Sequence, residues 1–328
     1  MSREIIELVD LTKKYGSHVA VDHLNLDVQK GEVFGLLGPN GAGKSTTILM
    51  MLGLTEPTSG KAKVCDIDST SNPIEVKRRV GYLPENVGFY EDLTGMENLM
   101  FTARLNRIPE GYAKQKIEEL FGRVGLTSVT NKKVGEYSRG MRQRLGIADV
   151  LIKEPEVIVL DEPTLGIDPT GVKELLELIV RLSKEEGLTV MLSSHHLHQV
   201  QQVCNRVGLF VNGKLFAEGD ISELSGKLFS NEPFIIEAGI GVPESNFSNT
   251  ATYDSSREQL KEALINLNDV VDVNIENNIF RIYSSRNNTA EIARLITGKG
   301  AELNYLQRKE YGLDDIYYRY FEEGNGHE

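Results

Sequence analysis

Short runs of alternating apolar and polar residues open the chain, at residues 5–8 and 19–28. A period of two predicts strands, and residues 15–17 between them have the composition of a turn. A brief apolar run at 32–37 comes next, followed by a glycine-rich turn and by apolar residues at helical spacing over 45–54. The first part of the chain is therefore predicted to form a small antiparallel lobe, and then a strand, a loop and a helix.

The pattern is helical between residues 91 and 126, with no strand-like run. Two later runs, 157–160 and 189–192, are short and fully apolar, as in strands buried in a parallel sheet, and a helical pattern at 171–184 separates them. We therefore expect an α/β fold with a parallel-sheet core that is interrupted by a helical subdomain at about 88–155. The core is expected to resume and close with these two strands.

A polar stretch at 225–232 ends this part of the chain, and a different order of elements follows. The predicted order is β-α-β-β-α-β, which is that of the ferredoxin-like fold, with a hairpin turn at Asn277 and Asn278 and a further helix at the end. The predicted elements are strands at 234–238, 270–275, 279–283 and 302–308, and helices at 256–267, 289–297 and 313–322. The sequence thus predicts two domains, the α/β domain at 1–228 and a small α+β domain at 229–328.

Length and charge limit the classes to which the chain can belong. Its 328 residues are enough for two domains with a core each. Acidic residues outnumber basic ones by 48 to 36, and the resulting formal net charge of -12 argues against a nucleic-acid partner. The two cysteines, Cys65 and Cys204, lie far apart, so neither a disulfide framework nor a metal cluster is expected. No run of about 18 apolar residues occurs, and we expect a cytosolic chain that spans no membrane.

A phosphate-binding loop is predicted between the apolar run at 32–37 and the helix that follows. Residues 38–45 read Gly-Pro-Asn-Gly-Ala-Gly-Lys-Ser and match the pattern G-x4-G-K-[ST]. In such a loop backbone N–H groups surround the phosphates of ATP, Lys44 neutralises the β and γ oxygens, and Ser45 is a ligand of Mg2+. The strand before and the helix after disfavour the alternative, a glycine-rich turn with no ligand. The predicted nucleotide contacts in this segment are Gly38, Pro39, Asn40, Gly41, Ala42, Gly43, Lys44, Ser45 and Thr46.

Two carboxylates follow the buried strand predicted at 157–160. If this strand and that of the phosphate loop are neighbours in a parallel sheet, Asp161 and Glu162 lie beside the loop. Asp161 is then expected to hold Mg2+ through its hydration shell, and Glu162 to orient and deprotonate the attacking water. The alternative is that Asp-Glu-Pro-Thr at 161–164 only makes a turn.

At this point the residues resemble one family, the nucleotide-binding subunits of ABC transporters, over residues 5 to about 219. Residues 137–143, Tyr-Ser-Arg-Gly-Met-Arg-Gln, resemble the ABC signature. Residues 165–168, Leu-Gly-Ile-Asp, resemble the D-loop, with its aspartate at Asp168. The resemblance also implies that Tyr15 stacks on adenine, although a plain strand-end aromatic is the alternative.

The signature has chemistry that can be read from its residues. Ser138 is placed to cap a helix beginning near Gly140, whose N-terminal N–H groups suit an anionic γ-phosphate. In the family that phosphate belongs to the opposing subunit's ATP. The resemblance therefore implies a homodimer in which Ser138, Arg139, Gly140 and Met141 face the partner's nucleotide. The alternative is an ordinary capped helix.

Three histidines lie close together at His195, His196 and His198. A zinc site needs about four ligands, and no cysteine is near, so metal binding is disfavoured. The resemblance implies that His195 is the switch histidine, which forms a hydrogen bond to the γ-phosphate and the attacking water. The alternative for His195 is a polar side chain at the end of a strand.

Three residues depart from the family's pattern. Glu85 stands where the family usually has glutamine, Arg139 replaces the usual glycine of the signature, and Met141 replaces its usual glutamine. A glutamate is a good ligand for Mg2+, so Glu85 is expected to complete the metal shell and to sense the membrane partner. These variants and the small C-terminal domain resemble the ABC-2-type branch.

The resemblance implies a transporter motor. ATP closes the homodimer, hydrolysis reopens it, and a separately encoded ABC-2-type membrane permease converts the motion into transport, with export as the expected direction. The subunit is then expected on the cytoplasmic face of the cell membrane. One alternative is a soluble ABC ATPase acting on ribosomes or DNA, against which the single cassette and the charge of -12 argue. The other is a regulatory nucleotide-binding module, which has no need of Glu162 as a base. The sequence does not name the cargo.

Overall fold

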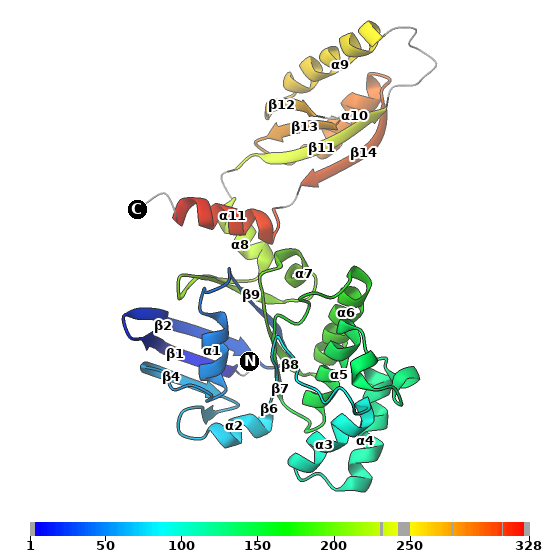
Figure 1. The fold of residues 1–328 in the computed structure, drawn as a ribbon. Coiled ribbons are helices and arrows are strands. Elements are labelled where there is room, and N and C mark those ends of the chain that lie inside the picture. Colours follow the sequence, from blue (N-terminus) through cyan, green and yellow to red (C-terminus); the bar gives the residue numbers. More distant parts are fainter. Residues whose placement is uncertain (1–3, 230–231, 242–249, 277–278, 310, 325–328) are drawn as a thin grey trace. The chain divides into compact units, whose positions relative to one another are not determined.

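The structure, a computed structural model, describes residues 4–229, 232–241, 250–276, 279–309 and 311–324. The chain divides into two compact units, Met1–Leu224 and Ser225–Glu328, whereas the sequence places the boundary between residues 228 and 229. In Figure 1 the first unit runs from blue to light green and the second from there to red. Within the described ranges, no helix combines the length and the apolar character needed to cross a lipid bilayer.

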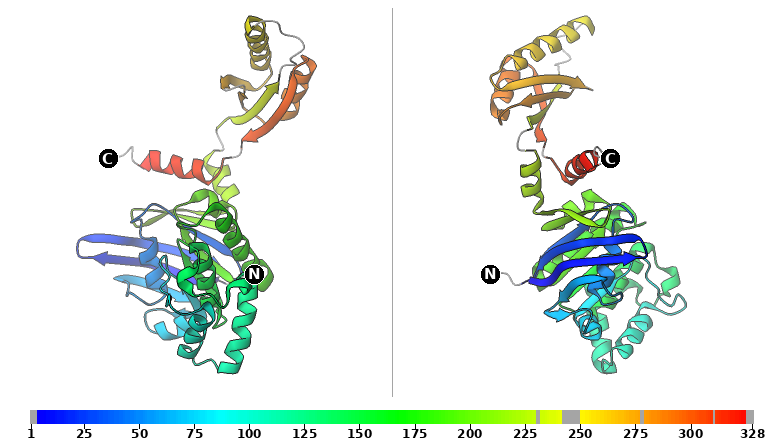
Figure 2. Two further views of the ribbon diagram at one scale, coloured as in Figure 1. Left: turned by 45° about the vertical axis from the view of Figure 1, so that its right-hand side comes forward. Right: turned by 90° about the vertical axis from the view of Figure 1, so that its left-hand side faces the viewer.

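An antiparallel sheet of four strands, in the order β2-β1-β4-β5, forms the expected lobe. Its strands β1 (Glu4–Tyr15) and β2 (His18–Gln29) are 12 residues long each and run side by side (Figure 2). Both are longer than the expected elements, and the turn between them is only Gly16 and Ser17. The other two strands are β4 (Ser59–Val64) and β5 (Ile67–Asp68).

A six-stranded sheet forms the centre of the first unit, in the order β10-β9-β3-β8-β7-β6. The strands are β3 (Val33–Leu37), β6 (Val80–Leu83), β7 (Val157–Asp161), β8 (Thr189–Ser194), β9 (Arg206–Val211) and β10 (Lys214–Gly219). Every residue of β3, β7 and β8 is buried, as their apolar runs predict for a parallel sheet. The expectation that the core closes with the strand at 189–192 is wrong, because β9 extends the parallel sheet on the other side of β3.

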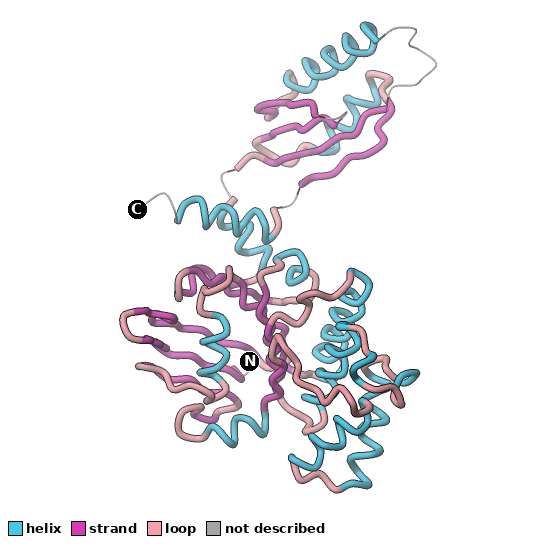
Figure 3. Tube along the Cα trace, viewed as in Figure 1, coloured by secondary structure: helices cyan, strands magenta, loops and turns pink. Residues whose placement is uncertain are grey.

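Helices make up the segment between β6 and β7, as the sequence predicts. They are α3 (Gly95–Leu105), α4 (Glu110–Arg123), the short 3-10 turns η1 (Thr127–Val129) and η2 (Val134–Glu136), and α5 (Arg139–Leu151). A capping box formed by Thr94 and Glu97 starts α3. Figure 3 shows these helices on the side of the six-stranded sheet away from the lobe. The other helices of the unit are α1 (Lys44–Met51), α2 (Pro73–Arg79), α6 (Pro169–Glu186) and α7 (Leu197–Gln201).

The second unit contains a four-stranded antiparallel sheet in the order β12-β13-β11-β14. The chain order β-α-β-β-α-β and this strand order are those of the ferredoxin-like fold, as expected. Ile236, Phe280 and Ile292 are among its buried core residues. The turn expected at Asn277 and Asn278 lies outside the described residues. The elements are β11 (Phe234–Gly241), α9 (Thr250–Ile265), β12 (Val270–Glu276), β13 (Ile279–Ser284), α10 (Thr289–Gly298) and β14 (Glu302–Lys309).

Helix α8 (Ile221–Leu228) leads into this ferredoxin-like module, and helix α11 (Leu313–Gly324) follows it. The rings of Phe229 and Tyr311 stack, with centroids 3.9 Å apart and planes inclined by 7°. Ser225 Oγ donates a hydrogen bond of 3.0 Å to the backbone oxygen of Tyr311. The chain therefore enters and leaves the module at one point.

Candidate nucleotide site

The loop that follows β3 reaches α1 through a glycine in a left-handed conformation. Gly43 has φ = 104° and directly precedes Lys44, the first residue of α1. A Cβ on Gly43 would lie 2.4 Å from the backbone oxygen of Ala20, so only glycine fits. The first turn of α1 contains no acidic residue, and its free N–H groups suit an anion. Within the loop, Asn40, Gly41 and Ser45 are exposed, Pro39 and Thr46 are half-buried, and Gly38, Ala42, Gly43 and Lys44 are buried.

The ammonium group of Lys44 points back into the loop. Its Nζ donates hydrogen bonds of 2.6 Å and 3.1 Å to the backbone oxygens of Gly38 and Pro39. Burial lowers the pKa of Lys44, while the nearby carboxylates of Glu162 and Asp161 oppose that shift. A buried cation held by loop carbonyls is suited to pairing with a phosphate group.

Asp161, the last residue of β7, is buried among hydroxyl groups from three other elements. Ser193 Oγ donates a short hydrogen bond to Asp161 Oδ1, and Ser45 Oγ lies 3.5 Å from the same oxygen. Tyr82, on the neighbouring strand β6, lies near enough for the Asp161 carboxylate to act on the pKa of its phenol. Burial and this neighbouring carboxylate raise the pKa of Tyr82 to about 12, which keeps the phenol protonated. The structure thus brings Ser45 and Asp161 together at the carboxyl end of the sheet.

Glu162 follows with φ = 48° and turns its carboxylate toward the phosphate loop. Its N–H contacts Ser193 twice, at 3.2 Å from the backbone oxygen and 3.1 Å from Oγ. Its Oε1 lies 3.8 Å from Lys44 Nζ and 3.0 Å from His195 Nδ1. The histidine contact lacks the alignment of a hydrogen bond, so both carboxylate oxygens are buried with no hydrogen-bond donor among the described residues. A carboxylate in this state suits accepting a proton from a water molecule.

The signature residues form a helix start, as the sequence predicts, but at a distance from these groups in the sheet. Ser138 is the N-cap of α5, and its Oγ accepts a hydrogen bond of 3.2 Å from the N–H of Met141. Ser138 and Arg139 are exposed, and Gly140 is buried. In the part of the chain that the structure describes, no hydrogen bond or ion pair joins the signature to the phosphate loop. The exposed start of α5 is therefore available to a group outside this chain.

The remaining predicted residues lie at element ends. Asp168 is the N-cap of α6 and accepts a hydrogen bond of 3.1 Å from the N–H of Gly171. Tyr15, at the end of β1, is half-exposed, and Lys13 Nζ lies 5.0 Å from its ring centroid. Glu85 is exposed two residues after β6, the edge strand that pairs with β7. Glu85 thus lies toward the same carboxyl end of the sheet as Asp161, although no hydrogen bond or ion pair joins these two described residues.

Two residues of the site, Tyr82 and Ser193, were given no role in the predictions from the sequence, although Tyr82 lies in the segment Gly-Tyr-Leu-Pro-Glu at 81–85. They lie beside Asp161 because β6, β7 and β8 are neighbours in the sheet, which the sequence alone does not reveal. Their one sequence signal is a hydroxyl group near the end of a buried apolar run. That signal is common to many serines and tyrosines.

Comparisons with known proteins agree with this geometry. The family model described as "ABC transporter" matches residues 21–165. The chain is 47% identical over 214 residues to the bacitracin transport ATP-binding protein BcrA of Bacillus licheniformis, covering 65% of this chain and 69% of that protein. It is 34% identical over 316 residues to the protein of the same name from Enterococcus faecalis, covering 95% of each.

Solved structures show the same fold. The structure of cbiO1 from Clostridium perfringens, part of the ABC transporter complex cbiONQ, superposes with a TM-score of 0.63 at 27% identity and covers 69% of this chain and 91% of that one. The dimeric structure of MJ0796, a bacterial ABC transporter cassette, gives a TM-score of 0.59 at 25% identity, covering 66% and 98%. The chain therefore belongs to the ABC transporter family and is one of its ATP-binding, ATP-hydrolysing subunits.

Proposed function

We propose that this subunit hydrolyses ATP in complex with Mg2+, with the following division of roles. Lys44 neutralises the β- and γ-phosphate oxygens, and the loop from Gly38 to Thr46 surrounds the phosphates with N–H groups. Ser45 and Asp161 hold Mg2+, with Glu85 completing the shell. Their oxygens suit this ion, which keeps few protein ligands and takes the rest from water and phosphate.

The carboxylate of Glu162 is the observation that carries this proposal. Both of its oxygens are buried without a hydrogen-bond donor, beside Lys44 and at the end of the strand that also carries Asp161. An unsatisfied buried carboxylate is costly unless a bound group supplies the missing donor. A water molecule placed beside the γ-phosphate is such a donor, and Glu162 then takes its proton while His195 holds the phosphate and the water.

The site proposed here is completed by a second copy of the chain. ABC transporter ATP-binding subunits work in pairs with a membrane permease, and the dimeric cassette of 25% identity supports a paired arrangement. Ser138, Arg139, Gly140 and Met141 of one copy would face the γ-phosphate bound by the other, and Tyr15 would stack on the adenine. The exposed cap of α5 supports this role, because a helix N-terminus attracts an anion.

The permease is proposed to be of the ABC-2 type, with the subunit bound at the cytoplasmic face of the membrane. The cargo is proposed to be an antibiotic of the bacitracin kind, moved outward. Support comes from the bacitracin transport protein of Enterococcus faecalis, whose match covers 95% of both chains and so includes the ferredoxin-like module. Expression with the cognate permease in a bacitracin-sensitive host tests the cargo alone, since unchanged sensitivity would reject bacitracin and leave the ATPase proposal standing.

The ATPase proposal is tested by Glu162→Gln, which keeps the side chain's size and removes the base. We expect unchanged ATP binding, turnover lowered by about 1,000-fold, and an accumulated nucleotide-bound dimer. The measurements are phosphate release, nucleotide binding and sedimentation with and without ATP.

A matched control is Glu156→Gln, just before the other end of β7, where the carboxylate pairs with Arg79 at 3.2 Å. Its turnover should stay within about twofold of the unmodified protein, because an exposed pair contributes little. Normal phosphate release by Glu162→Gln would remove Glu162 as the base.

A further inference from the structure

Asp161 lies between two hydroxyl groups that come from the strands on either side of β7. Ser193, on β8, is directly opposite Asp161 in the strand register. Tyr82, on β6, is opposite Val159, two residues before Asp161 on the same face of β7. The strand register therefore places the carboxylate between two side chains that are about 110 residues apart in the sequence.

The Ser193 hydroxyl connects both acidic residues of the site. It donates to Asp161 Oδ1 and accepts the N–H of Glu162 at 3.1 Å. Ser193 is fully buried, so water does not compete for either hydrogen bond. A single side chain thus fixes the orientation of one carboxylate and the backbone that carries the next.

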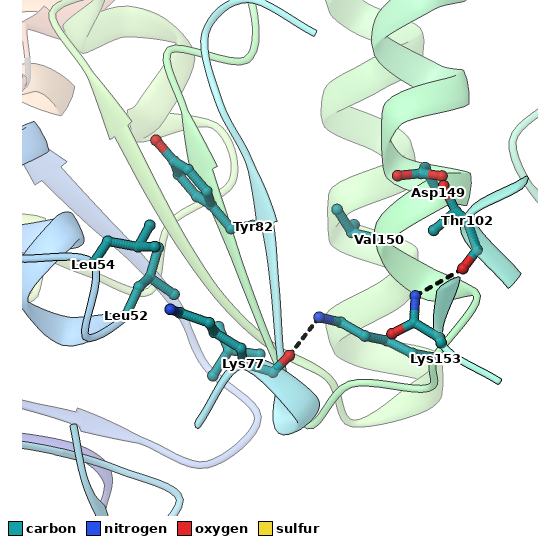
Figure 4. A pocket seen from close by; sticks show the side chains of 10 residues that line it. Leu52, Leu54, Lys77, Tyr82, Thr102, Asp149, Val150 and Lys153 are labelled. Atoms are coloured by element: carbon teal, nitrogen blue, oxygen red, sulfur yellow. Dashed lines mark hydrogen bonds between the residues drawn. The ribbon is translucent and has the colours of Figure 1, made fainter. Parts of the chain in front are cut away.

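The Tyr82 ring approaches from the opposite direction. It forms part of the wall of a pocket of about 320 Å³ (Figure 4), whose lining also includes Leu52, Leu54 and Lys77. In Figure 4 the hydroxyl of Tyr82 points away from Lys77 and Lys153. Burial and the Asp161 carboxylate, two residues along β7 from the register partner of Tyr82, raise the pKa of this phenol.

We propose that Tyr82 and Ser193 are positioning residues, whose two hydroxyl groups hold the Asp161 carboxylate in the orientation that receives Mg2+. This inference rests on the proposed function of the site. An ionised carboxylate has about four acceptor positions, so two donated hydrogen bonds leave positions free for the ion's hydration shell. Ser45, whose Oγ lies 3.5 Å from Asp161 Oδ1, has a different role because it is itself a proposed ligand of the ion.

The test separates binding of the ion from binding of ATP. Tyr82→Phe and Ser193→Ala each remove one hydroxyl and keep the rest of the packing. A fluorescent ATP analogue is titrated in EDTA, and then across a range of Mg2+ concentrations, with thermal unfolding as a check that each variant is folded. We expect unchanged affinity for the analogue in EDTA. The Mg2+ concentration that gives half of the gain in affinity should rise about tenfold, because loss of a hydrogen bond to a charged group weakens binding by about this factor.

Two control variants remove hydroxyl groups of the same kinds elsewhere in the first unit. Tyr112→Phe removes a phenol that donates to the Glu154 carboxylate at 2.8 Å. Ser69→Ala removes a fully buried hydroxyl that donates to the backbone oxygen of Met51 at 2.7 Å. Both controls should leave the Mg2+ dependence unchanged, whatever they cost in thermal stability.

Two results would overturn the proposal. One is a Mg2+ dependence that stays within about twofold of the unmodified protein in both Tyr82→Phe and Ser193→Ala. The other is an equal loss of affinity in EDTA and in Mg2+, which indicates general damage to the nucleotide site. Failure of the proposed function itself looks different, because the unmodified protein would then bind no ATP in either condition.

Discussion

His195 and Glu162 meet across neighbouring strands, with His195 Nδ1 3.0 Å from Glu162 Oε1 at the carboxyl ends of β8 and β7. The histidine is one-third exposed, whereas the glutamate side chain is only 10% exposed. His195 is therefore the more solvent-accessible member of the pair. Glu162 is thus suited to accept a proton, and His195 to bind a phosphate group or a water molecule that enters from solvent.

Replacing the histidine by His195→Ala should lower the rate of ATP hydrolysis by about 100-fold, because a positioned polar group contributes roughly that much to such a step. ATP affinity should change little, since Lys44 and the loop N–H groups remain. Steady-state turnover and nucleotide titration check both expectations. His198→Ala, on the exposed side of α7, is the matched control and should turn over normally. Equal loss in the two variants would contradict a specific role for His195.

Adding a methyl group to the phosphate loop should damage it in two ways. Gly43→Ala combines φ = 104° with a Cβ placed 2.4 Å from Ala20 O, and we expect a cost of about 1–3 kcal/mol and loss of ATP binding. Gly187→Ala, at φ = 68° with no atom within 4 Å, should cost about 1 kcal/mol and leave ATP binding intact. Urea unfolding and nucleotide titration give the two quantities. Tight ATP binding by Gly43→Ala would show that the loop adopts another backbone.

Removing the cap of the signature helix should separate stability from dimer formation. Ser138→Ala loses a cap hydrogen bond and should cost about 1 kcal/mol of unfolding free energy. Thr94→Ala removes the cap of α3 at a similar cost. In a Glu162→Gln background, only Ser138→Ala should also weaken the ATP-dependent dimer, which sedimentation measures. Equal dimer formation by the two variants would argue against the signature facing a partner's nucleotide.

Arg206 is the centre of a network of ion pairs whose contribution to the free energy of unfolding should depend on pH. Arg206 contacts Asp27, Glu32 and Glu218. Burial raises the pKa of Glu32, and it also raises the pKa of Glu218, although Arg206 opposes both shifts. A raised pKa means that the ionised form carries a penalty in the folded state, which is present at neutral pH and is relieved as pH falls through the raised pKa.

Arg206→Ala should therefore destabilise the chain more at pH 7.5 than at pH 5. We expect about 2 kcal/mol at the higher pH, less than the roughly 3–5 kcal/mol for breaking a fully buried pair, because these side chains are partly exposed. Urea unfolding at the two pH values measures the difference. Arg78→Ala breaks an exposed pair with Glu75 and should stay within about 0.5 kcal/mol at both. A pH-independent loss in Arg206→Ala would show that packing of the arginine, not its charge, is responsible.

Much of the fold follows from local patterns in the sequence. The apolar runs at β3, β7 and β8 are continuous because both faces of those strands are covered, and such runs are easy to recognise. The ferredoxin-like order of the second unit is likewise visible as alternating short strands and helices. The strand β9 was missed although it is apolar, because nothing local to Arg206–Val211 tells that it pairs with β3, some 170 residues earlier.

The grouping of the site's side chains was predictable where a motif names them and not where it depends on strand order. Lys44, Asp161 and Glu162 can be recognised in the sequence from their residue types and their spacing. The hydroxyl groups of Tyr82 and Ser193 become part of the site only when the sheet places β6 and β8 on either side of β7. No spacing in the sequence encodes that neighbourhood.

The stacked rings of Phe229 and Tyr311 have a practical consequence for work on this protein. A segment whose two ends meet can be exchanged for a foreign domain with close termini, because neither junction has to be stretched. A fluorescent reporter that replaces the module between these two aromatic residues would be attached at both of its ends. Its orientation would therefore be more restricted than that of a reporter fused to one terminus of the chain. The module between Phe229 and Tyr311 is thus a segment that an internal optical label could replace.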